Sequence, residues 1–261
     1  MKIGVALGGG AARGYAHVGV LKALERRGIH PDYIAGCSMG ALIGAIYCLG
    51  IDIDMLEGLS IAIKPNQWVD VSPSRTALIR GNKLEAMIAT LTGNRKIEEL
   101  AIPFCAVATD VISSEPYVFD SGDVATAVRA STAIPVVFEP VYVGEHVLVD
   151  GGFVDLIPVD IVKNMGADVT IAVDVGFSKS VQKPSNAADL LMMSIDALQK
   201  QLYTYKMVDA DYIIRPDVSF IKPNQFERAE ECIRVGEEAA EHFLAGLDIS
   251  KIKGKNNNAD S

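Results

Sequence analysis

The chain has 261 residues, and 49% of them are hydrophobic, which is enough for one large domain with a sizeable core. Its formal net charge of −9 argues against nucleic acid as a partner and against electrostatic docking on anionic membranes, but it does not exclude apolar contact with lipid. The cysteines are widely spaced, which predicts reduced thiols rather than a disulfide frame or a zinc site.

No apolar run approaches the roughly 20 residues of a spanning helix, and no signal peptide precedes the first glycines. We therefore expect a cytoplasmic protein. No proline-rich or serine-rich linker divides the sequence. The expected organisation is a single domain over residues 1–252, followed by a disordered tail over residues 253–261.

The first predicted elements are a strand, a glycine loop and a helix. Residues 2–7 are mostly apolar and end at Gly8, Gly9 and Gly10, and a helical pattern follows the loop. Three residues without Cβ leave backbone N–H groups open, and the helix N-terminus adds a partial positive charge. This arrangement predicts an anion site, either for a bound phosphate or for an oxyanion that exists only during a reaction.

A second strand and helix, over residues 33–35 and 41–49, are joined by Gly36-Cys37-Ser38-Met39-Gly40. This Gly-x-Ser-x-Gly segment has the pattern of a nucleophile elbow, a tight turn that exposes the serine Oγ above the sheet. The flanking Gly36 and Gly40 would let the strand and the helix pass closely. One such pentapeptide occurs by chance in many chains, but the preceding anion loop makes the signal strong.

The remaining pattern alternates apolar strands with helices, which predicts a mainly parallel sheet covered on both faces. Residues 52–81 have no strong period, so we expect short helices and loops there, serving equally well as a connector or as a lid. The later elements are expected as follows: helices at 82–91, 123–131, 159–165, 187–207 and 224–247, strands at 102–109, 117–119, 169–175 and 212–214, and a hairpin at 140–149. The apolar stripe of the 187–207 helix indicates core packing first and a lipid-facing patch second.

A serine hydroxyl needs a base, and histidine is the usual one. His242 would complete the order Ser…Asp…His, but its helical surroundings favour a surface or packing role. His17 lies beside the glycine loop and is expected to brace it.

Asp150 is the better candidate, because it ends the apolar strand 147–149 and Gly151 and Gly152 follow it. Taken alone, Asp-Gly-Gly is most simply a turn. A dry cleft would raise the basicity of an aspartate, whose ordinary pKa is about 3.9. Asp110 and Asp174 also end strands and compete for the same role.

Together, three motifs resemble the patatin-like phospholipase family, specifically its small bacterial members. The motifs are Gly8 to Gly14, Gly36 to Gly40 and Asp150 to Gly152, and the segment 130–140 is similar to a further family block. The resemblance covers about residues 3–215. It implies an α/β fold, a three-layer α/β/α sandwich with a mainly parallel central sheet. Ser113-Ser114-Glu115 departs from the family, since many relatives carry a threonine–glycine pair before the acid.

The resemblance also implies a Ser–Asp dyad with no catalytic histidine. Ser38 would be the nucleophile and Asp150 the proton acceptor, in a lipid acyl hydrolase that forms an acyl-serine. Gly8, Gly9, Gly10 and Met39 are the expected oxyanion-hole residues, with Gly9 and Gly10 as the first donors. Arg13 and Gly14 are expected to support the loop, and Arg13 has contact with a phosphate headgroup as its second interpretation. We expect a lipid or acyl-ester substrate, transient apolar contact with a membrane, and no metal, cofactor or nucleic acid.

Three alternatives stay open. Gly8-x-Gly10-x-x-Arg13 resembles a dinucleotide fingerprint, but the second strand does not end in the acid that such a site needs. An acyltransferase could use the same dyad. A regulatory or lipid-binding protein could keep the fold with little turnover. The sequence leaves phospholipid, lysophospholipid, neutral glyceride and thioester all open as substrates.

Overall fold

A computed structural model describes residues 1–176, 183–184, 186–205, 209–247 and 252. The central element is an eight-stranded sheet in the order β10-β9-β1-β2-β4-β8-β7, with β5 pairing with β4 beside this path. The strands are β1 Ile3–Leu7, β2 Tyr33–Cys37, β3 Ala77–Ile79, β4 Phe104–Asp110, β5 Glu115–Phe119, β6 Val136–Phe138, β7 Val141–Val143, β8 His146–Asp150, β9 Val169–Val173 and β10 Tyr212–Ile214.

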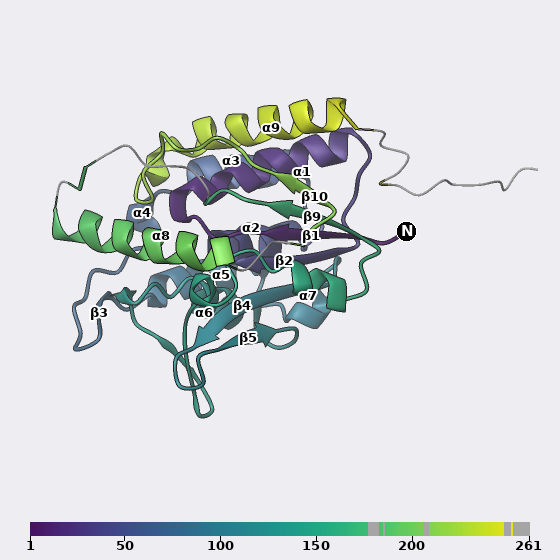
Figure 1. Cartoon of the computed structure of the whole chain (residues 1–261). Coiled ribbons are helices and arrows are strands. Elements are labelled where there is room, and N and C mark those ends of the chain that lie inside the picture. The colour runs from purple at the N-terminus through teal and green to yellow at the C-terminus, as the bar shows by residue number, and fades with distance from the viewer. Residues whose placement is uncertain (177–182, 185, 206–208, 248–251, 253–261) are drawn as a thin grey trace, which may run out of the picture.

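Helices cover both faces of this sheet, which confirms the predicted α/β architecture (Figure 1). The helices are α1 Ala16–Arg26, α2 Met39–Tyr47, α3 Ile53–Ala62, α4 Pro65–Trp68, α5 Asn82–Thr92, α6 Val124–Ser131, α7 Val159–Asn164, α8 Ala187–Tyr205 and α9 Ala229–Ala245. Short 3-10 turns lie at Ala11–Tyr15, Ile97–Glu99, Gly151–Phe153 and Phe226–Arg228.

The two faces of the sheet differ in residue size. In β1, Ile3, Val5 and Leu7 belong to the main core with α1, α2 and α9, whereas Ala6 belongs to a smaller core with α7. Successive side chains of a strand point to opposite faces, so this alternation of large and small residues fixes which face each helix covers. The sheet is parallel from β10 to β4 and antiparallel beyond β4, so the prediction of a mainly parallel sheet holds for its larger part.

Several predicted boundaries change. The helix expected over 224–247 begins with the 3-10 turn Phe226–Arg228 and becomes α9 only at Ala229. The segment 52–81 contains the ten-residue helix α3, longer than the short helices expected there. A second, two-stranded sheet of β3 and β6 was not predicted, because three-residue strands leave no periodic signal. The tail over residues 253–261 lies outside the described residues.

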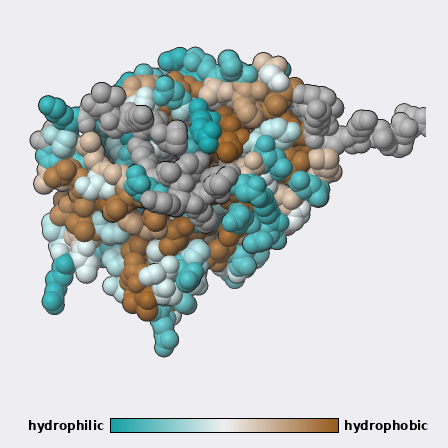
Figure 2. Space-filling model, viewed as in Figure 1, coloured by the Kyte–Doolittle hydropathy of each residue, from teal (hydrophilic) through white to brown (hydrophobic). Residues whose placement is uncertain are grey.

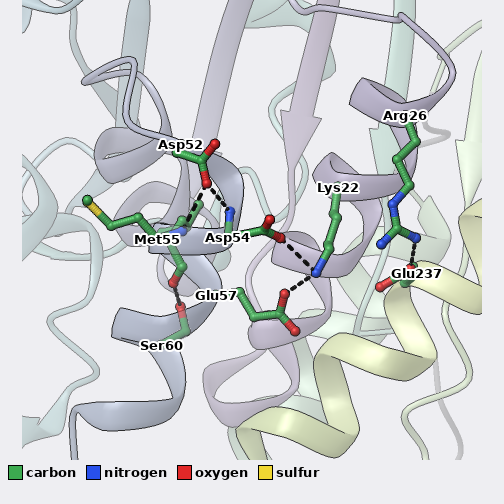
Figure 3. A network of polar contacts seen from close by, with 9 residues as sticks. Lys22, Arg26, Asp52, Asp54, Met55, Glu57, Ser60 and Glu237 are labelled. Atoms are coloured by element: carbon green, nitrogen blue, oxygen red, sulfur yellow. Dashed lines mark hydrogen bonds and ion pairs between the residues drawn. The ribbon is translucent and has the colours of Figure 1, made fainter.

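Polar contacts fix α3 to its neighbours (Figure 3). Lys22 of α1 forms ion pairs with Asp54, at 3.0 Å, and with Glu57, both on α3. Asp52 caps the start of α3, since its Oδ1 accepts the N–H groups of Asp54 at 2.9 Å and Met55 at 3.3 Å. A helix held at its first turn and along one side can serve as a firm wall for the site described below.

Of the helices that the structure describes, none combines the length and apolar character needed to cross a membrane.

Candidate active site

Ser38 stands on a strained turn between β2 and α2. Its φ of 53° and ψ of −122° lie in a region that residues with a side chain rarely adopt. Such a conformation costs about 1–3 kcal/mol and persists only where the surroundings impose it. Here the Ser38 N–H donates to Ser131 Oγ at 2.8 Å, and Ser131 Oγ donates to Val107 O at 2.6 Å. Ser131 was not singled out from the sequence, because a serine at the end of a helix has no distinctive pattern.

The glycines on both sides of Ser38 are required by close packing. A Cβ at Gly36 would lie 2.5 Å from the backbone of Gly40, and a Cβ at Gly40 would lie 2.1 Å from Leu7 O. Real Cβ atoms do not approach backbone this closely, so the elbow depends on glycine at both positions. The predicted close passage of strand and helix is confirmed.

Pairing along β4 brings Asp150 beside Ser38. Cys37, the last residue of β2, pairs with Val107, and Asp150, the last residue of β8, pairs with Ala108. The pairing partner of β4 therefore changes between Val107 and Ala108, from the parallel strand β2 to the antiparallel strand β8. Since Ser38 follows Cys37 directly, Ser38 and Asp150 meet at this change of partner.

The Asp150 carboxyl is buried and is only 2% exposed. Burial raises its pKa to about 6, while the nearby Ser38 side chain and the Gly152 N–H oppose that rise. The Gly152 N–H lies 2.9 Å from Asp150 Oδ1. Thr109 Oγ1 donates to the Asp150 backbone carbonyl at 2.8 Å and fixes the strand end. The acid is thus held toward the serine and is more basic than an aspartate in water.

The glycine loop lies against the nucleophile, since a Cβ at Gly9 would be 3.4 Å from Ser38 Cβ. The predicted donors divide into two groups. The Gly8 N–H donates to Val173 O at 3.1 Å and the Gly9 N–H donates to Leu156 O at 3.0 Å, so these groups already have partners. Within the described part of the chain, no acceptor bonds the N–H groups of Gly10 and Met39.

Two side chains brace this loop from behind. The His17 Nε2–H donates to Gly8 O at 2.7 Å, which confirms the expected bracing role. Complete burial lowers the pKa of His17 to about 4, so the ring is neutral at neutral pH.

Arg13 is 1% exposed, and its Nε–H donates to Ile221 O at 3.0 Å. Its Nη1 pairs with Asp196 of α8 at 3.2 Å. The adjacent Gly14 lies against Met39, because a Cβ there would be 2.4 Å from Met39 Cγ. These contacts suit residues that support the loop.

The competing acids have other partners. Asp110 accepts hydrogen bonds from His146 Nδ1 at 2.9 Å and Ser113 Oγ at 3.0 Å, and these partners hold its pKa well below the usual range. Asp174 bonds Arg215 Nε at 3.3 Å. His242 lies exposed on α9.

Two cavities meet at Ser38. One, of about 410 Å³, has Gly9, Gly10, Ser38 and Asp150 in its wall together with Gln199 of α8. None of the histidines is among the described residues that line it. The other, of about 770 Å³, runs between α2, α3 and α5 and is almost wholly apolar. Its lining includes Ser38, Ile43, Leu56, Trp68, Met87 and Leu91.

The segment 52–81, predicted as a connector or a lid, thus supplies a wall of the apolar cavity through α3 and Trp68. The contribution of α8 to the smaller cavity was missed, since its stripe indicated core packing first. Among the described residues, no group of histidine, cysteine, aspartate and glutamate side chains is placed to hold a metal ion.

The chain is similar in sequence to known proteins. An uncharacterized NTE family protein of Mycobacterium bovis is 37% identical over 182 residues, which cover 69% of this chain and 50% of the relative. Lysophospholipase nte1 of Aspergillus fumigatus is 37% identical over 180 residues, which cover 67% of this chain and 12% of the relative. The chain therefore spans half or less of the length of these relatives.

Among solved structures, VipD from Legionella pneumophila superposes with a TM-score of 0.67 over 94% of this chain and 66% of that one. At 16% sequence identity this likeness shows the fold alone. A family model described as patatin-like phospholipase matches residues 5–163, more than half of the chain. The chain belongs to the patatin-like phospholipase family.

Proposed function

We propose that this chain is a serine hydrolase of lipid carboxylic esters, of the EC 3.1.1 type, with Ser38 as nucleophile and Asp150 as proton acceptor. One observation carries the proposal. A buried carboxyl whose pKa is raised to about 6 lines one cavity with a serine on a strained elbow, and no histidine lies among the described residues that line this cavity. A base with a pKa near the working pH is suited to proton transfer.

In the acylation step, Ser38 Oγ attacks the ester carbonyl carbon and Asp150 takes the hydroxyl proton. The carbonyl oxygen gains the negative charge. The N–H groups of Gly10 and Met39 are the proposed donors for this oxyanion, since those of Gly8 and Gly9 bond to backbone carbonyls. One such donor stabilises the transition state by about 3–4 kcal/mol. The Gly8–Gly9 segment then holds the glycine loop in place through these two backbone hydrogen bonds.

The intermediate collapses when the C–O bond to the alcohol breaks and Asp150 returns its proton to the leaving oxygen. In deacylation, Asp150 takes a proton from water, which attacks the carbonyl carbon of the acyl-serine. The bond from this carbon to Ser38 Oγ then breaks, Asp150 returns the proton to Oγ, and the fatty acid leaves. His17 takes no part in this scheme, because its Nε2–H is held by Gly8 O and the ring is neutral.

The apolar cavity beside Ser38 supports a long acyl chain as the group transferred, since a cavity of about 770 Å³ with apolar walls excludes polar ligands. The name lysophospholipase of one relative supports lysophosphatidylcholine as the first natural substrate to test. An acyltransferase would use the same dyad, so an acceptor alcohol is added in a parallel assay.

The test compares hydrolysis of a soluble p-nitrophenyl ester and of lysophosphatidylcholine by the wild type, Ser38→Ala and Asp150→Asn. Both variants should lose at least about a thousandfold in kcat, as expected when either member of a nucleophile–base pair is removed. His242→Ala is the control and should retain wild-type activity, with melting curves to show that every variant is folded.

Loss of activity in a folded His242→Ala variant would indicate a triad in place of the dyad. Equal activity of the wild type and Ser38→Ala would favour a regulatory or lipid-binding protein. Transfer of the acyl group to the added alcohol in preference to water would favour an acyltransferase.

A further inference from the structure

Helix α8 lines the smaller of the two cavities that meet at Ser38, here called the Ser38 cavity, with a partly polar side. Met192, Asp196 and Gln199 line that cavity together with Ser38 and Asp150. Asp196 forms the ion pair with Arg13, and a Cβ at Gly152 would lie 2.4 Å from Gln199 Nε2. The inward side of α8 therefore contacts both the glycine loop and the turn that follows Asp150.

The solvent-facing part of α8 exposes large apolar side chains. Leu190, Leu198 and Leu202 are 55%, 59% and 49% exposed. Their spacings of eight and four residues place them on one side of a helix with 3.6 residues per turn. A helix that covers a core normally turns its apolar stripe inward and its polar residues outward. In α8 these three leucines are about half exposed, whereas Asp196 and Gln199 line the cavity together with Met192 and Ile195.

A groove of about 1650 Å³ runs between α8 and the small β3–β6 sheet and is lined mostly by apolar side chains. Met193 lies on one side and Leu78 on the other, while the three exposed leucines lie outside this lining, on the neighbouring surface of α8. Leu78 is 49% exposed and Val136 of β6 is 52% exposed. Figure 2 shows hydrophobic surface on the side of the molecule where Figure 1 places the first turns of α8 and β3.

This groove leads directly to the reaction centre. Ala11 and Ile134 line both the groove and the Ser38 cavity, and Trp68 and Phe138 line both the groove and the apolar cavity. Apolar side chains thus continue from the exposed rim through the groove to the place proposed for the acyl chain.

We propose that the outer leucines of α8, with Leu78 and Val136, form a docking surface for zwitterionic phospholipid, such as the surface of a phosphatidylcholine vesicle. This inference deepens the proposed lipid hydrolase by naming how its substrate reaches Ser38. Continuity with the apolar cavity favours lipid over a protein partner. Lys183 and Lys222 line the groove together with Asp189 and Asp196, a mixture of charges that suits a zwitterionic headgroup. The net charge of −9 opposes anionic membranes.

The experiment measures flotation of the Ser38→Ala protein with phosphatidylcholine vesicles, so that binding is recorded without turnover. In that background, Leu190→Gln, Leu198→Gln and Leu202→Gln are combined, since glutamine has nearly the helix propensity of leucine. The partition coefficient should fall about tenfold or more, because half-exposed leucines lose their transfer into lipid. The matched control combines Met55→Gln, Ile112→Gln and Tyr142→Gln, which are 57%, 71% and 67% exposed elsewhere, and it should bind as the parent does.

Melting temperatures of both triple variants should equal that of the parent. Binding that survives the leucine changes, or that falls equally in the control, would overturn the proposal, and so would a requirement for anionic lipid. Sedimentation shows whether the leucines instead join two copies of the chain, which would also overturn it. If the Ser38→Ala protein floats with the vesicles but the wild type hydrolyses no ester, the docking surface stands and the proposed function is refuted.

Discussion

At the scale of single residues, the protonation of Asp150 governs the proposed reaction. Burial raises its pKa to about 6, and only the ionised carboxylate can accept the proton of Ser38. We therefore expect kcat/KM to be level above about pH 7 and to fall about tenfold per pH unit well below pH 6. The measurement is a pH profile with the soluble ester, with circular dichroism at each pH to confirm the fold. A flat profile through pH 6 would remove Asp150 from the role of base.

The two residues of the proposed dyad could be singled out from the sequence, because each stands in a short motif with its own physical reason. Ser38 needs glycines on both sides, and Asp150 needs a strand end and a turn. The backbone N–H groups that could bind the oxyanion could not be predicted as closely. Whether the N–H of Gly9 or that of Gly10 is open depends on Leu156 O, which lies 147 positions away in the sequence and has no local signal.

At the scale of elements, α5 offers a test of the apolar cavity. Met87 of α5 lines the cavity, so a bulkier side chain there should shorten the acyl chain that fits. We expect Met87→Trp to reduce kcat/KM for long-chain p-nitrophenyl esters by about tenfold or more and to spare butyrate, since overpacking costs about 1–3 kcal/mol. The measurement is kcat/KM across a series of chain lengths.

Met55→Trp is the matched control, because Met55 is 57% exposed on α3 and does not line this cavity. It should leave the chain-length preference unchanged. An equal loss for butyrate and the long esters in Met87→Trp would contradict an acyl-binding role of the cavity.

Elements with a continuous apolar run or a clear helical period were predictable, as β1, β9 and α5 illustrate. The orientation of α8 was not. Its leucines and methionines indicated core packing, yet three of the leucines are about half exposed, while Met192 lines the cavity together with Asp196 and Gln199. Hydrophobic periodicity gives the width of an apolar stripe, but only tertiary contacts show what that stripe meets.

At the scale of the whole molecule, the site depends on the change of partner along β4. The pairings of Val107 with Cys37 and of Ala108 with Asp150 bring together two strand ends, Cys37 and Asp150, that are more than 110 residues apart in the sequence. The motifs predicted which residues would act, whereas the reason they meet lies in a mixed sheet whose antiparallel part cannot be derived from local patterns. The strain at Ser38 and the burial of Asp150 both follow from this junction, so the fold as a whole stabilises them.

The last prediction concerns the stability of the whole fold. In the folded chain the pKa of Asp150 is about 6, whereas in the unfolded chain it is near 3.9. Between these values the folded state binds more protons, so wild-type stability falls as pH rises through this window, by up to about 3 kcal/mol. Asp150→Asn has no charge to bury. Its free energy of unfolding, relative to wild type, should rise by up to about 3 kcal/mol between pH 4 and pH 7.

Urea unfolding at a series of pH values measures this difference, and every other titrating group cancels between the two proteins. Asp160→Asn, which replaces an exposed aspartate of α7, is the control, and its difference from wild type should stay within about 0.5 kcal/mol at all pH values. An Asp150→Asn variant that gained no stability at neutral pH would mean that the carboxylate is well solvated in the folded chain. Because the same burial makes Asp150 basic, gain of stability and loss of catalysis in this one variant would have a single cause.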